Sequence, residues 1–490
     1  MWLKNKTLSN KSRTEIIQLY LLFAISVVII YKLPGIIGTI FQIILLIAFW
    51  RSKREYFWLA FVFVIGSEPG YLFAKVDAAH SFSLLYNSSF GNLYFSLVFI
   101  IIAFLKIVQK KNKTPLFLKT NFVVIFSYLV VQIIAFGLYK TTVTIRMTLP
   151  WLLVFILPNA IKEEKQLLAL FRLIFAFVIF VLITQIYKIL TGLEFATLFG
   201  GMASEVVDAR GGIEEVGVAL RPVYGIFVPF IAIWGSIYFL TMKKHYFSRQ
   251  YLSIILGLSV ISIYLTATRS WLIASLFIVA FFIVIASRRP VKTLSRIILA
   301  TLLILMVIQA IPFLEKQVEL SLARYETLEY FMKGDITAGG TSKRFDVRAK
   351  RPLRGFTENP IIGWGISDEY KQYADGHVGY HNLLMSAGLI GFIFWMLLWG
   401  NFIKKMLEAN QRIKGNAYKN IPLVLISFSL SILIIHTTTQ WFGYLIGFNN
   451  AFAIALLFMM GQRIFYPDRT METIDKNYKT IISTETSLSK

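Results

Sequence analysis

The strongest constraint on the fold of this chain is its series of long apolar runs. About fourteen runs follow one another between residues 16 and 461, and roughly 20 apolar residues make a helix that crosses about 30 Å of hydrocarbon. Within lipid, backbone polar groups must be satisfied inside the segment itself, so these runs are expected to be helices. Hydrophobic residues make up 57% of the 490 residues. The sequence therefore predicts an all-α polytopic membrane protein with about 12–14 transmembrane helices, in which the run at 56–74 is the weakest.

The connections between the runs explain the net charge of +24. Lys and Arg concentrate near both termini and in residues 51–54, 110–113, 288–289 and 404–405, whereas the alternate connections are close to neutral. Because Lys and Arg resist translocation, the basic set marks the cytoplasmic side, where both termini are expected. The first run lacks a small-residue cleavage site and is expected to remain as a helix. Apart from one cluster described below, no basic patch indicates nucleic-acid binding.

Two outer connections are long, at about residues 188–221 and 314–380, and function is to be sought there. The second is predicted to begin with an amphipathic helix at 318–329, because apolar residues recur there at helical spacing. The chain contains no cysteine, which excludes disulfides, thiol catalysis and thiolate metal sites. Any catalysis must use other side chains.

A short basic helix is expected to follow in the second loop, starting at Ser342. Arg344 and Arg348 share one of its faces with Arg351. Pro352 is expected to end or bend this helix, and the Asn-Pro and Gly residues of 359–365 predict a turn-rich return to the bilayer. A solvated face or attraction to anionic lipid headgroups is an alternative interpretation of the basic cluster.

Two further arginines lie where apolar runs begin at the outer side. Arg269 stands between two apolar helices with almost no loop, and Arg221 opens a segment that re-enters the membrane. A permanent charge at the edge of the bilayer is costly without an anion, and guanidinium groups suit phosphate oxygens. A polyanion such as a lipid-linked diphosphate is therefore a candidate ligand. Each arginine could instead be a snorkelling anchor or part of a structural ion pair.

His381 is the candidate proton-transfer group. It lies in Tyr-His-Asn-Leu-Leu at 380–384, where the long loop returns to an apolar run, and a neutral imidazole accepts a proton near neutral pH. The alternative is a structural residue at the start of an interfacial helix. His377 is close by, but no set of further ligands suggests a metal site. Of the remaining histidines, His436 could be an interhelical hydrogen-bond donor, and the other two are expected at the surface.

Three motifs in order carry a resemblance to a known family. They are Thr-Ala-Thr-Arg-Ser at 266–270, then Arg344 ahead of Glu-Asn-Pro-Ile-Ile-Gly-Trp-Gly at 358–365, then His-Asn-Leu-Leu at 381–384 with Ala-Gly-Leu-Ile-Gly at 387–391. This series resembles the O-antigen ligase and O-antigen polymerase superfamily over residues 205–400. Arg221, followed by Gly225, Phe227 and Pro229, is similar to an earlier pattern of that family.

The resemblance implies a GT-C-type inverting glycosyltransferase of the bacterial inner membrane that uses neither a metal ion nor a cofactor. Its donor would be an oligosaccharide on undecaprenyl diphosphate, and its acceptor a hydroxyl group on a glycan or lipid-linked molecule at the extracytoplasmic face. Arg221 and Arg269 would bind the diphosphate, and His381 would deprotonate or orient the acceptor. Arg344 and Arg348 are further candidates for phosphate contacts.

The resemblance divides the chain into three parts. They are N-terminal transmembrane helices at 1–204, a catalytic region at 205–402 that includes the loop 314–380, and C-terminal helices with a cytoplasmic tail at 403–490. A polymerase of surface polysaccharide is slightly favoured over a lipopolysaccharide ligase by the number of spans. A protein O-oligosaccharyltransferase remains an alternative, and so does a flippase or transporter of lipid-linked glycans, which would use broken helices such as the one suggested at 68–70.

Overall fold

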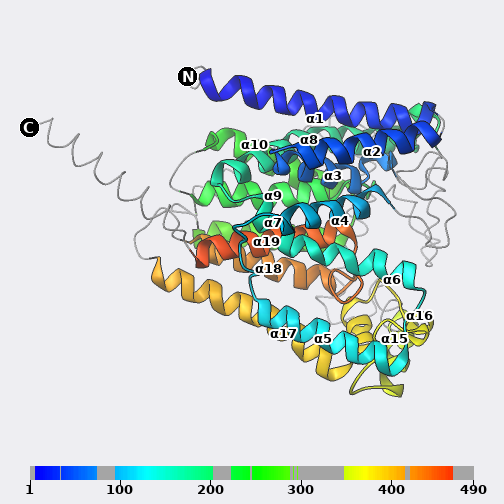
Figure 1. Cartoon of the computed structure of the whole chain (residues 1–490). Coiled ribbons are helices and arrows are strands. Elements are labelled where there is room, and N and C mark those ends of the chain that lie inside the picture. Colours follow the sequence, from blue (N-terminus) through cyan, green and yellow to red (C-terminus); the bar gives the residue numbers. More distant parts are fainter. Residues whose placement is uncertain are drawn as a thin grey trace, which may run out of the picture.

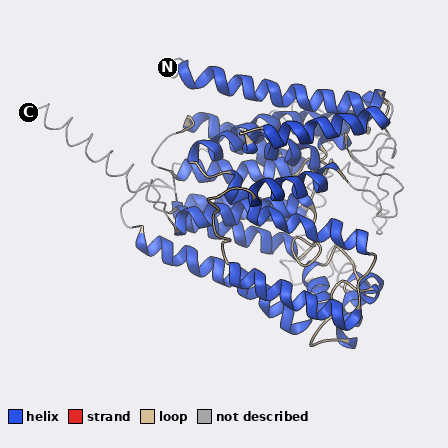
Figure 2. Ribbon diagram, viewed as in Figure 1, coloured by secondary structure: helices blue, strands red, loops and turns tan. Residues whose placement is uncertain are grey.

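Helices build the fold throughout the described part of the chain, where no β-strand forms (Figure 2). The structure, a computed structural model, describes residues 6–33, 35–73, 94–201, 222–242, 246–286, 291, 295, 347–413 and 420–466. Figure 1 shows most of the long helices running side by side as a bundle. The first half contains α1 (Lys6–Lys32), α2 (Gly35–Arg51), α3 (Glu55–Gly66), α4 (Phe95–Val108), α5 (Lys119–Phe136), α6 (Thr141–Thr148), α7 (Leu153–Ala160) and α8 (Glu164–Thr191). The second half contains α9 (Phe227–Thr241), α10 (Arg249–Leu265), α11 (Arg269–Phe281), α15 (Lys350–Glu358), α16 (Asp368–Tyr373), α17 (Gly379–Arg412), α18 (Ile421–His436) and α19 (Phe448–Phe465).

The prediction of an all-α polytopic membrane protein is confirmed. Among the described residues, 6 helical segments are long and apolar enough to cross a membrane, and seven shorter apolar helices accompany them. Apolar side chains face outward on several of these helices, with Ile134 of α5 80% exposed. Such a surface fits lipid rather than water. The expected run near 296–313 and the amphipathic helix at 318–329 lie outside the described residues.

The weakest predicted span is the most deeply enclosed helix of the N-terminal half. The apolar residues of α3 are all buried, among them Phe61 and Phe63, which are fully enclosed by their neighbours. The helix ends at Gly66, and a 3-10 turn follows at Pro69–Tyr71. Glu68 has a φ of 52° and Gly70 a φ of 61°, so the chain turns out of the helical path there. The expected run at 56–74 is therefore broken, with its helical part confined to 55–66.

Helix α18 contacts both of the helices that carry the candidate site. Both α11 and α17 pack against it. Figure 1 shows α15 and α16 gathered at the end of the bundle where α17 begins, while α17 ends on the side where α1 begins. The segment between α15 and α17 therefore lies at one end of the bundle.

Gly388 breaks α17, with a φ of 62° and a ψ of −175°. At the break, the backbone N–H groups of Leu389 and Ile390 donate to the carbonyls of Pro360 and Ile361 at 2.8 and 3.2 Å. In return, the N–H of Gly365 donates to the carbonyl of Ser386 at 2.7 Å. The predicted turn at 359–365 is confirmed. It satisfies backbone groups that the broken helix leaves without partners.

One expectation for the basic helix is wrong. Pro352 does not end a helix, because α15 begins at Lys350 and continues past it to Glu358. The expected start of the basic helix at Ser342 lies outside the described residues. Pro352 stands in the first turn of α15, a position in which proline is tolerated.

Candidate functional site

His381 lies in the first turn of α17 and is half-buried. The next residue, Asn382, is fully buried, and the oxygen and nitrogen of its side-chain amide hold the turn. Its Oδ1 accepts a hydrogen bond from the backbone N–H of Asp375 at 3.0 Å, and its Nδ2 donates to Oε1 of Gln440 at 2.6 Å. Asn382 thereby connects the end of the extramembrane loop to the turn that follows α18. These contacts fix the backbone on which His381 stands.

Tyr370 of α16 joins this polar cluster from the loop side. Its phenol is buried, and burial raises the pKa of Tyr370 to about 12. The hydroxyl therefore stays protonated at neutral pH. Sequence reasoning did not select Asn382, Gln440 or Tyr370 as members of the site. The polar run Thr-Thr-Thr-Gln at 437–440 between two apolar runs is the signal that could have found Gln440.

His436 supports the start of α17 from behind. It is fully buried, and its Nδ1 accepts a hydrogen bond from the backbone N–H of Trp441 at 3.0 Å. Its ring stacks on Phe442 with 3.7 Å between centroids and meets Tyr380 edge-on at 4.7 Å. Through Nδ1, His436 is thus an acceptor within the turn that follows α18. It fixes the end of α18 against the residue next to His381.

Arg269 is the first residue of α11 and is half-buried. The N-cap residue Thr268 makes no capping hydrogen bond through its side chain, and Ala267 before it has a φ of 49°. The first backbone N–H groups of a helix have no intrahelical acceptor, and the helix dipole favours an anion there. The first turn of α11 therefore combines a guanidinium group with a helix N-terminus, which is a setting suited to phosphate oxygens.

Tryptophan contacts bring the start of α11 to the start of α17. Trp271, in the first turn of α11, lies 5.2 Å from Trp441 between ring centroids. Trp441 is hydrogen-bonded to His436, which in turn contacts Tyr380. Arg269 and His381, which are far apart in sequence, thus occupy helix starts that meet the C-terminal end of α18.

The segment before α9 approaches the same place. Phe227 packs against Trp271 at 5.0 Å. The backbone N–H of Gly225 donates to the carbonyl of Ser67 at 2.8 Å, and Gly225 has a φ of 84°. A Cβ atom at this position would come within 3.2 Å of the Cα of Pro69, so the close approach requires glycine.

The remaining predicted arginines differ in what the structure shows. Arg221 and Arg344 lie outside the described residues. Arg348 is half-buried directly before α15, and α15 packs against α17. Within the described residues, no group of three or more His, Asp and Glu side chains could hold a metal ion.

Residues 254–396 match the O-antigen ligase family model. The predicted resemblance to the O-antigen ligase superfamily is thereby confirmed. The match begins in α10, ends at the middle of α17, and includes Arg269, Arg348 and His381. No curated protein matches the chain.

Proposed function

We propose that the protein is a bacterial inner-membrane glycosyltransferase that moves an oligosaccharide from undecaprenyl diphosphate to an acceptor hydroxyl. The observation that supports this most strongly is that the O-antigen ligase match contains both Arg269 and His381, while their helices start at the same end of α18. A charge-binding group and a proton-transfer group on rigid helices are what glycosyl transfer from a diphosphate requires.

Arg269 forms the donor half of the proposed site. Its guanidinium and the N-terminal amides of α11 bind the diphosphate and offset the negative charge that grows on the leaving group. Arg221 contributes a second guanidinium, and Arg344 and Arg348 supply further positive charge from the loop. Because arginine provides this charge, the reaction needs neither a metal ion nor a cofactor.

His381 forms the acceptor half. The acceptor oxygen attacks the anomeric carbon from the face opposite the diphosphate, so the configuration inverts. The bond between the anomeric carbon and the diphosphate oxygen breaks, and undecaprenyl diphosphate leaves with the bonding electron pair. The proton of the acceptor hydroxyl passes to the imidazole of His381. Asn382 and His436 position this turn without touching the substrate.

The proposed acceptor is a growing surface glycan or another lipid-linked sugar, as in a polymerase or ligase, at the extracytoplasmic face. The test is a panel of acceptors offered to the purified protein in proteoliposomes with a labelled donor, with and without a chelator. Glycosylation of a single acceptor class, at the same rate with and without the chelator, supports the proposal. Movement of intact donor between leaflets with every acceptor left unmodified would instead indicate a flippase.

A further inference from the structure

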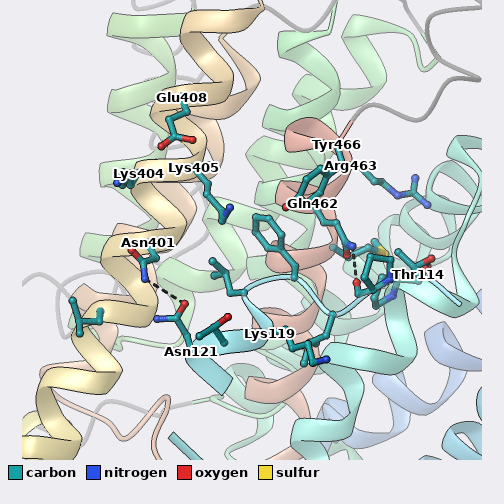
Figure 3. A pocket seen from close by; sticks show the side chains of 18 of the residues that line it. Thr114, Lys119, Asn121, Asn401, Lys404, Lys405, Glu408, Gln462, Arg463 and Tyr466 are labelled. Atoms are coloured by element: carbon teal, nitrogen blue, oxygen red, sulfur yellow. Dashed lines mark hydrogen bonds between the residues drawn. The ribbon is translucent and has the colours of Figure 1, made fainter. Parts of the chain in front are cut away.

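A large cavity lies at the end of the bundle opposite to His381. Its volume is about 1020 Å³. It is bounded by the segment that leads into α5, by the second half of α17 and by the last turns of α19 (Figure 3). About three turns of α17 separate Phe394, the lining residue nearest to His381 on this helix, from the first turn of α17, and about six turns separate Lys404 and Lys405 from it, so the cavity is not part of the site described above.

Positive charge dominates the lining of this cavity. Five basic residues contribute to it, namely Lys119, Lys162, Lys404, Lys405 and Arg463. Glu408 is the one carboxylate in the lining, and it is engaged by Arg412 at 3.5 Å. In the part of the chain that the structure describes, no ion pair involves Lys119 or Lys405. Such an excess of positive charge in a partly enclosed space favours an anionic occupant.

Aromatic rings hold Lys405 toward the interior of the cavity. Its Nζ lies 4.2 Å from the centroid of the Phe465 ring and 5.9 Å from that of Phe117. Figure 3 shows this side chain pointing from α17 toward Gln462 and Tyr466 on the facing helix. Cation–π contacts with several rings keep the ammonium group in place without neutralising its charge.

Gln462 adds a hydrogen-bond acceptor that the protein does not use. The residue is 6% exposed, and its Nε2 donates to the carbonyl of Pro115 at 2.7 Å. Its Oε1 is buried and has no hydrogen-bond partner among the described residues. Since a buried unsatisfied acceptor is costly, a donor such as a hydroxyl group of a bound molecule would stabilise it.

The lining also has an apolar side that opens toward lipid. Val124 of α5 is 38% exposed and Leu397 of α17 is 51% exposed, and both line the cavity together with Phe394. The cavity therefore continues from a basic end into a surface suited to acyl chains.

We propose that this cavity binds an anionic phospholipid with a hydroxylated headgroup. The phosphate lies against Lys405, a headgroup hydroxyl donates to Oε1 of Gln462, and the acyl chains run along Val124 and Leu397, while Lys119 adds to the positive charge of the lining. The shared chemistry is a phosphate ester, which a soluble phosphate ester also offers. The apolar side of the cavity selects the lipid. This site is independent of glycosyl transfer.

The test measures lipid binding by native mass spectrometry of the delipidated full-length protein. Phosphatidylglycerol is expected to bind more tightly than phosphatidylcholine or glycerol phosphate. Replacing Lys119 and Lys405 by Met keeps the apolar stems and removes both charges, and it should weaken binding by about fivefold for each lysine. The matched control replaces Lys111 and Lys113, which are exposed and do not line the cavity, and it should leave binding unchanged.

Three results would overturn the proposal. The first is equal binding of phosphatidylglycerol and phosphatidylcholine by the wild-type protein. The second is a loss of lipid binding in the double variant that is no larger than the loss in the control variant, when both proteins are equally monodisperse. The third is glycerol phosphate binding as tightly as the lipid, which would assign the site to a soluble phosphate ester. Replacing Gln462 by Leu provides an independent check. It should weaken the binding of phosphatidylglycerol more than the binding of phosphatidic acid, whose headgroup has no glycerol hydroxyl.

Discussion

At the scale of single residues, His381 carries the chemistry of the proposal. Replacing it by Ala should lower the rate of glycan transfer by about 10²–10⁴-fold, since this is the usual contribution of a general base. Donor binding should persist, because Arg269 is unchanged. The matched control is His377→Ala, four residues upstream and exposed, which should transfer at the wild-type rate. Equal rates for both variants in a reconstituted assay would remove His381 from the mechanism.

Arg269 should govern donor affinity rather than acceptor chemistry. Its replacement by Ala should raise the dissociation constant for the lipid diphosphate by about tenfold to a hundredfold, the value of a charge-assisted contact. Arg269→Lys should recover only part of this loss, because an ammonium group lacks the planar fork. Arg249→Ala is the control, since Arg249 also begins a helix but is exposed at the start of α10. Unchanged donor binding by Arg269→Ala would show that this arginine is a structural anchor.

The sequence alone could select these two residues but not their setting. An arginine between two apolar runs and a histidine where a long loop ends are visible as exceptions to the hydropathy pattern. The contacts that position them come from Trp271, Trp441 and His436, and each of these residues belongs to an apolar run or its edge. A large aromatic residue in such a run does not reveal its partner, because any helix of the bundle could supply one.

At the scale of elements, the break in α17 supports the candidate site. A Cβ at Gly388 would collide with the carbonyl oxygen of Ile361, and the backbone there has a φ of 62°. Gly388→Ala should therefore destabilise the protein by about 2 kcal/mol or more and lower the rate of transfer. A Cβ added at Gly400 in the same helix meets no atom within 4 Å, so Gly400→Ala should be neutral or should stabilise the protein by up to about 1 kcal/mol. Thermal unfolding in detergent measures both, and equal melting temperatures would contradict this role of Gly388.

The elements also show where hydropathy patterns stop being informative. Apolar length predicted the helices, and Asn359-Pro360 with two nearby glycines predicted the turn. The break at Gly388 could not be predicted from hydropathy, because the apolar run continues through it and its hydrogen-bond partners lie in a separate segment. Pro352 was misjudged for a related reason. Its effect depends on where the helix begins, which the basic cluster does not reveal.

At the scale of the whole molecule, the proposed function requires that the two ends of the bundle face opposite sides of the membrane. The chain contains no cysteine, so each introduced thiol is unique. Gly376→Cys, next to the candidate site, should react with an impermeant maleimide in intact spheroplasts. Lys111→Cys, at an exposed connection of the basic set, should react only after permeabilisation. Labelling of both positions without permeabilisation would overturn the predicted orientation.

The most direct test of the proposed function is the stoichiometry of the reaction in proteoliposomes that contain only the purified protein, donor and acceptor. One undecaprenyl diphosphate should be released for each glycosidic bond formed, with inverted anomeric configuration, and His381→Ala should lose both products together. Glycan transfer without release of undecaprenyl diphosphate, or equal release by His381→Ala, would contradict the proposed function.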